Sequence, residues 1–559
     1  NYAAFLLGMP STTSITRAAE YDEYSITWGF FVQDDWRVNE KLTLNLGLRY
    51  EVESPLTERQ NRSASNFDYG YTQPIEAAAQ ARYAALNDPA LKALLPQISV
   101  KGGLMFLDKD TETLYTTPKN TFLPRFGFVY KVDDKTVVRG GAGLFAGFLG
   151  QRRGDVYQPG YSQTTTIGTT VNDFGAPIPR YWENALLSQP ILEPVGNAGG
   201  RQTFLGSGIS FFNPNPKVSK QLRWQFGVQR ELPGGFTAEA TYVGNHGYDI
   251  EINRNINALP NKYLNTDNSR TAAMTANNLF LSAAVANPFA GLLPGTGFNN
   301  PTIARRQLLR PYPAFGDITT QVNDGKTWYH SGQFSLQKRF SKGYTVGASY
   351  TYSRWMQATE FLNAGDEKPT KMISDLDVPH RLSLSAIFEL PFGKGKPFLS
   401  EAGPVVEALL GGWQIQGVYT FQAGFPVAFG TNGFYNGGDI ALAADQRTTL
   451  KWFNTDVFTT LQSGTSANAT PVDHLRTLPL RFTEVRRDSI NNFDLSVLKN
   501  VRVPGGIDIQ LRAEFINALN EPYFPGPVTG MTSATFGQIS ASNQDNYARR
   551  AQLGVKILF

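Results

Sequence analysis

The segment Leu42–Val52 alternates apolar and polar side chains at almost every position. Because successive side chains of a β-strand point to opposite faces, the segment predicts a strand with one apolar and one polar face. The apolar face would carry Leu42, Leu44, Leu46, Leu48, Tyr50 and Val52. The opposite face includes the charged pair Arg49 and Glu51. A helix would place apolar residues every three or four positions, and this segment lacks that period.

The same pattern recurs along the chain, mostly as hairpins whose short turns are rich in Asp, Gly and Pro. About thirteen strands of roughly ten to fourteen residues are expected, and strands of ~9–11 residues are long enough to cross a bilayer. We expect them over Tyr24–Val38, Leu42–Val52, Phe122–Val132, Thr136–Leu149, Gln221–Leu232, Phe236–His246, Trp328–Phe340, Tyr344–Trp355, His380–Leu390, Trp413–Phe421, Asn492–Val501, Ile507–Ala518 and Tyr547–Phe559.

The last strand ends on an aromatic residue. Its apolar face would hold Phe559, Ile557, Val555 and Leu553, and the intervening positions are polar or small. This is the pattern of a closing strand in an outer-membrane barrel, whose aromatic end lies at the membrane boundary. A half-buried strand of a soluble sandwich would read the same way, so the connections between strands must decide.

The connections alternate between short turns and long segments, which are 53–121, 150–220, 247–327, 356–379, 422–491 and 519–546. Compact soluble domains rarely hold irregular loops longer than ~15 residues. Bacterial outer-membrane barrels have short periplasmic turns and long extracellular loops. We therefore expect an all-β fold, a transmembrane antiparallel barrel with long extracellular loops and a periplasmic C-terminus. Short surface helices are expected within Pro74–Leu95, with a break at Asp88–Pro89, and at Pro404–Leu410.

Composition narrows the protein class further. The 559 residues contain no run of 18 apolar residues, so the sequence predicts no membrane-spanning helix. Cysteine is absent, which removes disulfides, zinc–thiolate sites and cysteine nucleophiles. The net charge of +4 and the lack of Lys/Arg runs argue against a nucleic-acid partner. No signal-peptide pattern follows Asn1, so we expect a mature chain or one that lacks its front.

Several motifs in fixed order resemble the Oar-like TonB-dependent outer-membrane receptors. They are WGFFVQDDWRVNEKLTLNLGLRYE, RFGFVYKVDDKTVVRGGAGLF, LPFGKGKPF followed by GGWQIQGVYTFQAGFPV, and LRAEFINALNEPYF. The resemblance spans about residues 24–559, with poor matches in the loops. It implies a bacterial outer-membrane location, a substrate-capturing receptor and a partner in the TonB complex.

Members of that family have a signal peptide, a regulatory-like β-domain, a plug and a 22-stranded barrel. The resemblance therefore implies that this chain holds the last 13–14 strands. Residues 24–559 would form this C-terminal barrel portion, and residues 1–23 a partial strand and loop, with Tyr2–Met9 as the stub of a fourteenth strand. The plug and the N-terminal domain would be absent, so contact with TonB would run through a missing N-terminal region.

Candidate catalytic and metal-binding residues are sparse. The four histidines are far apart in sequence, and none is at metal-ligand spacing from another. They are His246, His330, His380 and His474. We expect His330 and His380 near strand starts, at the rim of the barrel. The Gly140–Gly147 segment looks like a phosphate loop but lies within a strand, where small residues would relieve crowding inside the barrel. No nucleophile motif is present, although a triad defined only by geometry stays open. We expect no enzyme, cofactor or metal.

Two charged groups receive structural interpretations. Of Asp34 and Asp35, one must face the apolar side, and we expect it at the membrane interface beside Trp36. Arg512 and Glu514 share the polar face of the penultimate strand with Asp508 and Gln510, so lumen charges would pair there. Contact with a plug is the alternative.

The sequence thus predicts an outer-membrane barrel for TonB-coupled uptake of an unidentified substrate. A surface adhesin or structural barrel, or a passive porin, are the alternatives, because one fold hosts several functions. Expected partners are outer-membrane lipid, facing Leu42, Leu44, Leu46 and Leu48, and the barrel-assembly machinery, which would read the C-terminal strand. The sequence identifies no ligand-binding residue.

Overall fold

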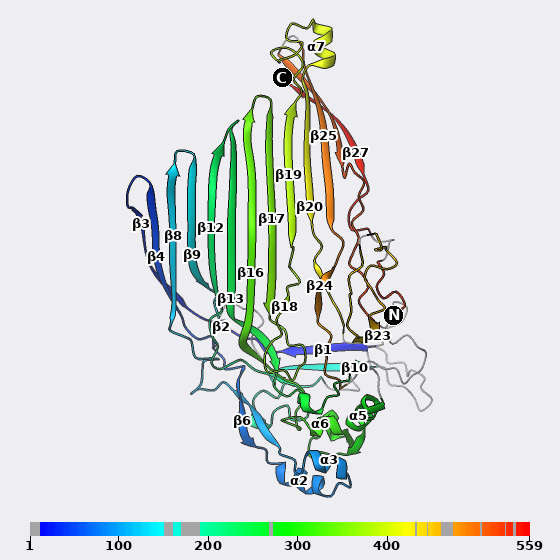
Figure 1. Cartoon of the computed structure of the whole chain (residues 1–559). Coiled ribbons are helices and arrows are strands. Elements are labelled where there is room, and N and C mark those ends of the chain that lie inside the picture. The colour runs from blue at the N-terminus through cyan, green and yellow to red at the C-terminus, as the bar shows by residue number, and fades with distance from the viewer. Residues whose placement is uncertain are drawn as a thin grey trace.

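The computed structural model describes residues 12–149, 160–168, 191–267, 272–430, 433–443, 445–459, 473–503, 506–531, 533–539 and 544–559. Its main feature is one large sheet (Figure 1), in which a continuous antiparallel row of long strands is joined by two short strands, one of them parallel to its neighbour. Along the row, in chain order, lie β3 (Thr27–Arg37), β4 (Leu42–Glu53), β8 (Thr121–Asp133), β9 (Thr136–Ala146), β12 (Lys220–Leu232), β13 (Phe236–Asn255), β16 (Ile318–Ser341), β17 (Tyr344–Ala358), β19 (His380–Glu389), β20 (Trp413–Gln422), β25 (Ile490–Val503), β26 (Ile507–Ile516) and β27 (Arg550–Leu558).

Each strand of this row pairs with its neighbours in sequence order, so the sheet is a simple meander. All thirteen strands expected from the sequence are present. Strands β3 and β27 form the two edges of the sheet, and in the described part of the chain they do not pair with each other. The short turns and the C-terminus lie at one end of the sheet, and the loop structure lies at the other (Figure 1).

The register gives the sheet two chemically distinct faces, because directly paired residues share a face. One row of paired residues runs through Leu44, Phe128, Gly140, Phe226, Tyr242, Gly332 and Tyr352. The adjacent row runs through Asn45, Gly127, Gly141, Gln225, Val243, Ser331 and Ser353. We call these the apolar face and the polar face. The alternation predicted from single strands is therefore continuous across neighbouring strands.

Two predictions about strands need correction. Strands β13 and β16 have 20 and 24 residues, far beyond the expected Phe236–His246 and Trp328–Phe340. Their pairing is irregular around Gly247, Ile250 and Ile252, and these irregularities hide the period-two pattern. For the same reason His330 lies within β16 rather than near its start, whereas His380 does begin β19.

Gly140 also lies elsewhere than expected. It is on the apolar face, where a Cβ atom would meet the ring of Phe128 at 2.5 Å. Its missing side chain makes room for an aromatic ring on the apolar face, whereas the prediction assigns the small residues to crowding inside a barrel. Gly141 and Gly143 lie on the opposite, polar face. The segment is part of β9, so it is no phosphate loop.

Beyond the strands, the long connections fold into structures with cores of their own. The helices α2 (Glu76–Ala84), α3 (Pro89–Leu94), α5 (Ala272–Ser282) and α6 (Arg305–Leu308) lie at the loop end with β6 (Ala64–Thr72) (Figure 1). The first loop core includes the buried residues Phe67, Tyr83, Leu91, Phe211, Phe289, Leu308 and Phe315. The second loop core includes Phe429, Phe453, Phe458, Phe482, Met531 and Phe536. Leu281, Phe289 and Leu293 from the connection between β13 and β16 supply part of the first core.

Both expected surface helices are present. The Pro74–Leu95 segment contains α2 and α3, and the break falls at Asp88, whose side chain caps α3 by accepting from the Leu91 N–H at 3.1 Å. Helix α7 covers Pro404–Leu410, as predicted. None of the described helices combines the length and the apolar character that crossing a bilayer requires. The expected strand stub Tyr2–Met9 lies outside the described residues. Strand β1 (Thr12–Ala18) pairs with β10 (Ser162–Gly168), apart from the large sheet.

Candidate functional site

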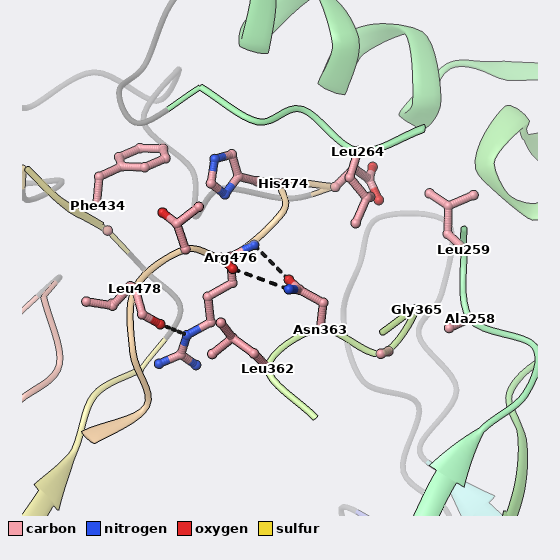
Figure 2. Close-up of a pocket in the computed structure, with 14 residues that line it drawn as sticks. Ala258, Leu259, Leu264, Leu362, Asn363, Gly365, Phe434, His474, Arg476 and Leu478 are labelled. Atoms are coloured by element: carbon pink, nitrogen blue, oxygen red, sulfur yellow. Dashed lines mark hydrogen bonds between the residues drawn. The ribbon is translucent and has the colours of Figure 1, made fainter. Parts of the chain in front are cut away.

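A cavity of about 330 Å³ lies between the two loop cores. Leu259 on one wall packs against the first core, and Leu478 on another belongs to the second. Three loops that are far apart in sequence form most of the lining, and their side chains converge on it (Figure 2). The apolar lining residues are Ala258, Leu259, Leu264, Leu362, Ala364, Phe434 and Leu478.

Asn363 and Arg476 hold two of these loops together. The Arg476 backbone N–H donates to Asn363 Oδ1 at 2.7 Å, and Asn363 Nδ2 donates to the Arg476 carbonyl at 3.2 Å (Figure 2). The Arg476 guanidinium donates to the carbonyls of Leu478 and Phe429 at 2.7 and 2.8 Å. Burial lowers the pKa of Arg476 from its ordinary value. Arg476 therefore acts mainly as a brace for the backbone around the cavity.

His474 lines the same cavity with a defined orientation. Its Nε2 lies 2.6 Å from the Asp267 carbonyl, and because a carbonyl only accepts, Nε2 is the donor. Its ring meets that of Phe434 edge-on, with centroids 4.9 Å apart. Next to it, Asp473 accepts from Arg306 Nη1 at 3.2 Å and links this loop to α6. The cavity thus presents an imidazole, an amide and apolar side chains, which suits binding of a small organic group.

The polar face of the sheet holds a second hollow of about 490 Å³. Gly127, Gly141 and Gly143 form its floor. Over it, the guanidiniums of Arg125 and Arg223 lie 4.7 and 5.1 Å from the ring centre of Phe145. The hollow is therefore a basic, glycine-floored depression in the wall.

Other charges on the polar face pair with one another, as the sequence predicts. Arg139 bonds Glu239, and Arg49 bonds Glu51. On β26, Arg512 donates to Gln510 Oε1 at 2.6 Å and lies 3.9 Å from Glu514, while Asp508 pairs with Arg502 on β25 at 2.9 Å. Of the two acidic residues near the turn, Asp34 pairs with Leu46 on the apolar face, and Asp35 accepts from the Asn45 amide on the polar face.

The four histidines do not converge. Three lie on the apolar face, where Nδ1 of His330 is 2.7 Å from the Tyr242 hydroxyl, Nδ1 of His380 is 2.8 Å from the Tyr350 hydroxyl, and Nδ1 of His246 is 3.0 Å from the Thr327 carbonyl. His474 lies in the loops. Among the described residues, no three His, Asp or Glu side chains form a group that could hold a metal ion.

The residues predicted to face lipid, and the three predicted assembly residues that lie within β27, are on the apolar face, while Phe559 follows the end of this strand. Leu42, Leu44, Leu46 and Leu48 pair with Tyr130, Phe128, Phe126 and Pro124 of β8. On the edge strand, Leu553, Val555 and Ile557 pair with Ala513, Leu511 and Ile509. Leu553 is 82% exposed and the terminal Phe559 is fully exposed. The described residues therefore leave Leu553 and Phe559 uncovered, and Leu46 and Leu48 are about two fifths exposed.

Comparison with known proteins decides the family. Residues 1–552 match the protein family described as outer membrane beta barrel domain. The chain belongs to this family. It is a protein of the bacterial outer membrane, and its family is described by a barrel rather than by a catalytic activity. No curated protein matches the chain.

Several solved structures are similar to this barrel domain at low identity. They include FpvA of Pseudomonas aeruginosa bound to pyoverdine (10% identity, TM-score 0.38, covering 96% of this chain and 38% of that one). For the outer membrane transporter YddB from Escherichia coli, the identity is 10% and the TM-score 0.39, covering 96% of this chain and 54% of that one. For the FrpB iron transporter from Neisseria meningitidis, the identity is 11% and the TM-score 0.35, covering 96% of this chain and 56% of that one. The barrel domain thus spans between about two fifths and just over half of the length of these chains.

Proposed function

We propose that this barrel domain is part of an outer-membrane receptor that captures a substrate in its loops and takes it up by coupling to TonB. The observation that carries the proposal is the folded loop structure at one end of a two-faced sheet, with a cavity between its two cores. A passive pore does not require loops that are packed around two hydrophobic cores. The motif resemblance to Oar-like TonB-dependent receptors supports the same function.

The proposal assigns the two faces of the sheet to two environments. The apolar face, with Leu42, Leu44, Leu46 and Leu48, contacts lipid. The polar face lines a hydrated lumen. The C-terminal strand with Leu553, Val555, Ile557 and Phe559 is read by the barrel-assembly machinery. Residues 24–559 are the C-terminal part of a 22-stranded barrel whose TonB contact lies in an upstream segment.

Comparing strains of the native bacterium tests the function without knowing the substrate. Spent medium is analysed by mass spectrometry for three strains, which carry the wild-type chain, Asn363→Ala or a tonB deletion. A receptor predicts a compound that the wild type removes and that both other strains leave behind. Arg447→Ala is the matched loop control, because Arg447 lies in the loops, does not line the cavity and should not alter uptake.

The alternatives give different patterns in the same experiment. A passive porin would keep removing the compound after tonB deletion. With an adhesin or a structural barrel, the Asn363→Ala strain would remove the same compounds as the wild type. Either result would overturn TonB-coupled uptake.

A further inference from the structure

One connection at the short-turn end is unlike the others. Strands β19 and β20 are joined by residues 390–412, which include α7, whereas the other pairs at this end are joined by a few residues. In Figure 1, α7 stands beyond the strand ends, close to the C-terminus. A tight turn would have sufficed to connect the strands, so the extra residues call for a separate explanation.

Two side chains place α7 on the outer side of the sheet. Trp413 and Lys499 are paired across β20 and β25, in register with the apolar-face pair Ile415 and Val497. Trp413 Nε1 donates to the Leu409 carbonyl at 2.8 Å, and Lys499 Nζ donates to the Gly411 carbonyl. Because both donors project from the apolar face, the C-terminal end of the helix lies on that side of the wall.

The helix buries none of its residues in the chain. Val405 is 72% exposed and Leu409 65%, and these two residues lie one helical turn apart. Other large apolar side chains of the same connection are exposed as well: Phe392, Phe398, Leu399, Val406 and Leu410. A contiguous apolar surface of this kind is typical of contact with a partner or a membrane.

The apolar face itself indicates where the membrane boundary lies. Three cationic side chains of this face lie near the described turns. Lys338 and Lys499 are almost fully buried, whereas Arg230 is exposed and lies 3.9 Å from Asp133. Lys338 directs its amine to the Ser341 and Tyr344 carbonyls of the adjacent turn, as Lys499 does to Gly411. Long amines that bend toward a membrane boundary in this way, beside a tryptophan, mark the edge of the hydrocarbon layer. The C-terminal end of α7, to which Trp413 and Lys499 donate, is adjacent to that level.

We propose that α7 and the preceding turn around Phe398 form an interfacial anchor, inserted at the boundary between acyl chains and headgroups of the phospholipid leaflet at the short-turn end. The occupant is lipid because the exposed surface continues the apolar face of β19 and β20 at the boundary level. Its arc of Val405, Val406, Leu409 and Leu410 enters the leaflet sideways, as amphipathic interfacial helices do. The inference rests on the proposed lipid contact of the apolar face.

Single cysteines in the full chain test the anchor directly, because the natural sequence contains none. Val405→Cys and Leu409→Cys are labelled with an environment-sensitive fluorophore, and the protein is reconstituted in phosphatidylcholine–phosphatidylglycerol vesicles with spin-labelled lipids. We expect blue-shifted emission and strong quenching by lipids labelled near the headgroup. Leu553→Cys on β27 reports the lipid face, and Leu279→Cys on α5, with 66% exposure, reports an apolar residue in water.

The controls separate the possible failures. If Leu553→Cys is not quenched, the proposed lipid face is wrong. If Leu553→Cys is quenched but Leu409→Cys behaves like Leu279→Cys, the lipid face stands and the anchor is wrong. Blue-shifted but unquenched labels on α7 would mean that protein covers the helix, such as a second copy, and would also overturn the anchor. Amide hydrogen exchange of 404–410 in the unmodified chain, slower in vesicles than after delipidation, gives a readout independent of the variants.

Discussion

The Arg486 guanidinium and the Asp377 carboxylate form an ion pair at 2.7 Å between two loops separated by 109 residues. The Asp377 side chain is only 1% exposed and that of Arg486 15%. The other carboxylate oxygen of Asp377 accepts from the Trp355 backbone N–H, and Arg486 also donates to the Asp377 carbonyl at 3.0 Å. The pair thus fastens the loop between β17 and β19 to β24 (Arg481–Arg486).

Removing one charge of this pair should loosen the loops. Asp377→Asn leaves Arg486 buried without a counter-charge, and breaking such a pair costs about 3–5 kcal/mol. We expect faster protease cleavage within 356–379 while the β-sheet signal in circular dichroism is retained. Asp456→Asn is the matched control, because the exposed pair of Lys451 and Asp456 should contribute at most about 1 kcal/mol. Equal cleavage of the two variants would contradict the role of the Asp377 pair.

Neighbouring positions on β4 should respond oppositely to a new charge. Leu46 lies on the apolar face and Asn45 on the polar face. Leu46→Arg should cost about 2–4 kcal/mol near the bilayer midplane and impair assembly, whereas Asn45→Arg should be tolerated in a wet lumen. Folded and unfolded barrels are separated by their different gel mobility without heating. Similar folded fractions for both variants would show that the faces are wrongly assigned.

The sequence predicts the strands well because their physics is local. In Leu42–Val52 the polarity of each residue indicates which face of the sheet it occupies, and the turn residues mark where each hairpin reverses. The prediction weakens where the local pattern breaks, as at the irregular pairing of Ile250 and Ile252 that extends β13. Gly140 shows a related difficulty. The alternation along its strand predicts its face, but the reason for a glycine there is the ring of Phe128 on the neighbouring strand.

The candidate site was not predictable in the same way. Asn363 and Arg476 are 113 residues apart, and their reciprocal hydrogen bonds exist only because two loop cores bring them together. His474 is not at metal-ligand spacing from another histidine, and nothing near it in sequence indicates Phe434 or the Asp267 carbonyl. Irregular loops have no repeating side-chain pattern, so the sequence predicts α2 and α3 but not α5, α6 or the two shared cores.

The C-terminal aromatic residue allows assembly to be separated from stability. The Phe559 side chain is fully exposed, so deleting it removes no packing within the chain. If the assembly machinery reads this residue, deletion should lower the amount of folded protein in the outer membrane severalfold, with little change in the unfolding of the purified barrel. Leu558→Ala, one position earlier on the opposite face, is the control. Normal membrane levels after deletion of Phe559 would exclude the signal.

The Asp88–Arg305 pair makes the loop structure sensitive to acid. Arg305 Nε donates to Asp88 Oδ2 at 2.6 Å and so ties α3 to α6 across 217 residues. Burial acts to raise the pKa of Asp88, but the hydrogen bond from the Leu91 N–H and the interactions with Arg305 outweigh it and hold the pKa below the ordinary value of 3.8. The folded state therefore favours the carboxylate, and this stabilisation is present above pH 3.8.

Acidification should weaken this tie before other parts of the loops. As the pH falls through 3.8 and below, the unfolded carboxyl takes up its proton first, and the contribution of Asp88 to stability is progressively lost. We expect amide hydrogen exchange in 89–94, corrected for its intrinsic pH dependence, to accelerate over this range. In Asp88→Asn the cap on α3 can persist but the charge is gone, so exchange should be faster at neutral pH and lose most of its acid dependence. An unchanged acid response in Asp88→Asn would assign the effect to another carboxyl group.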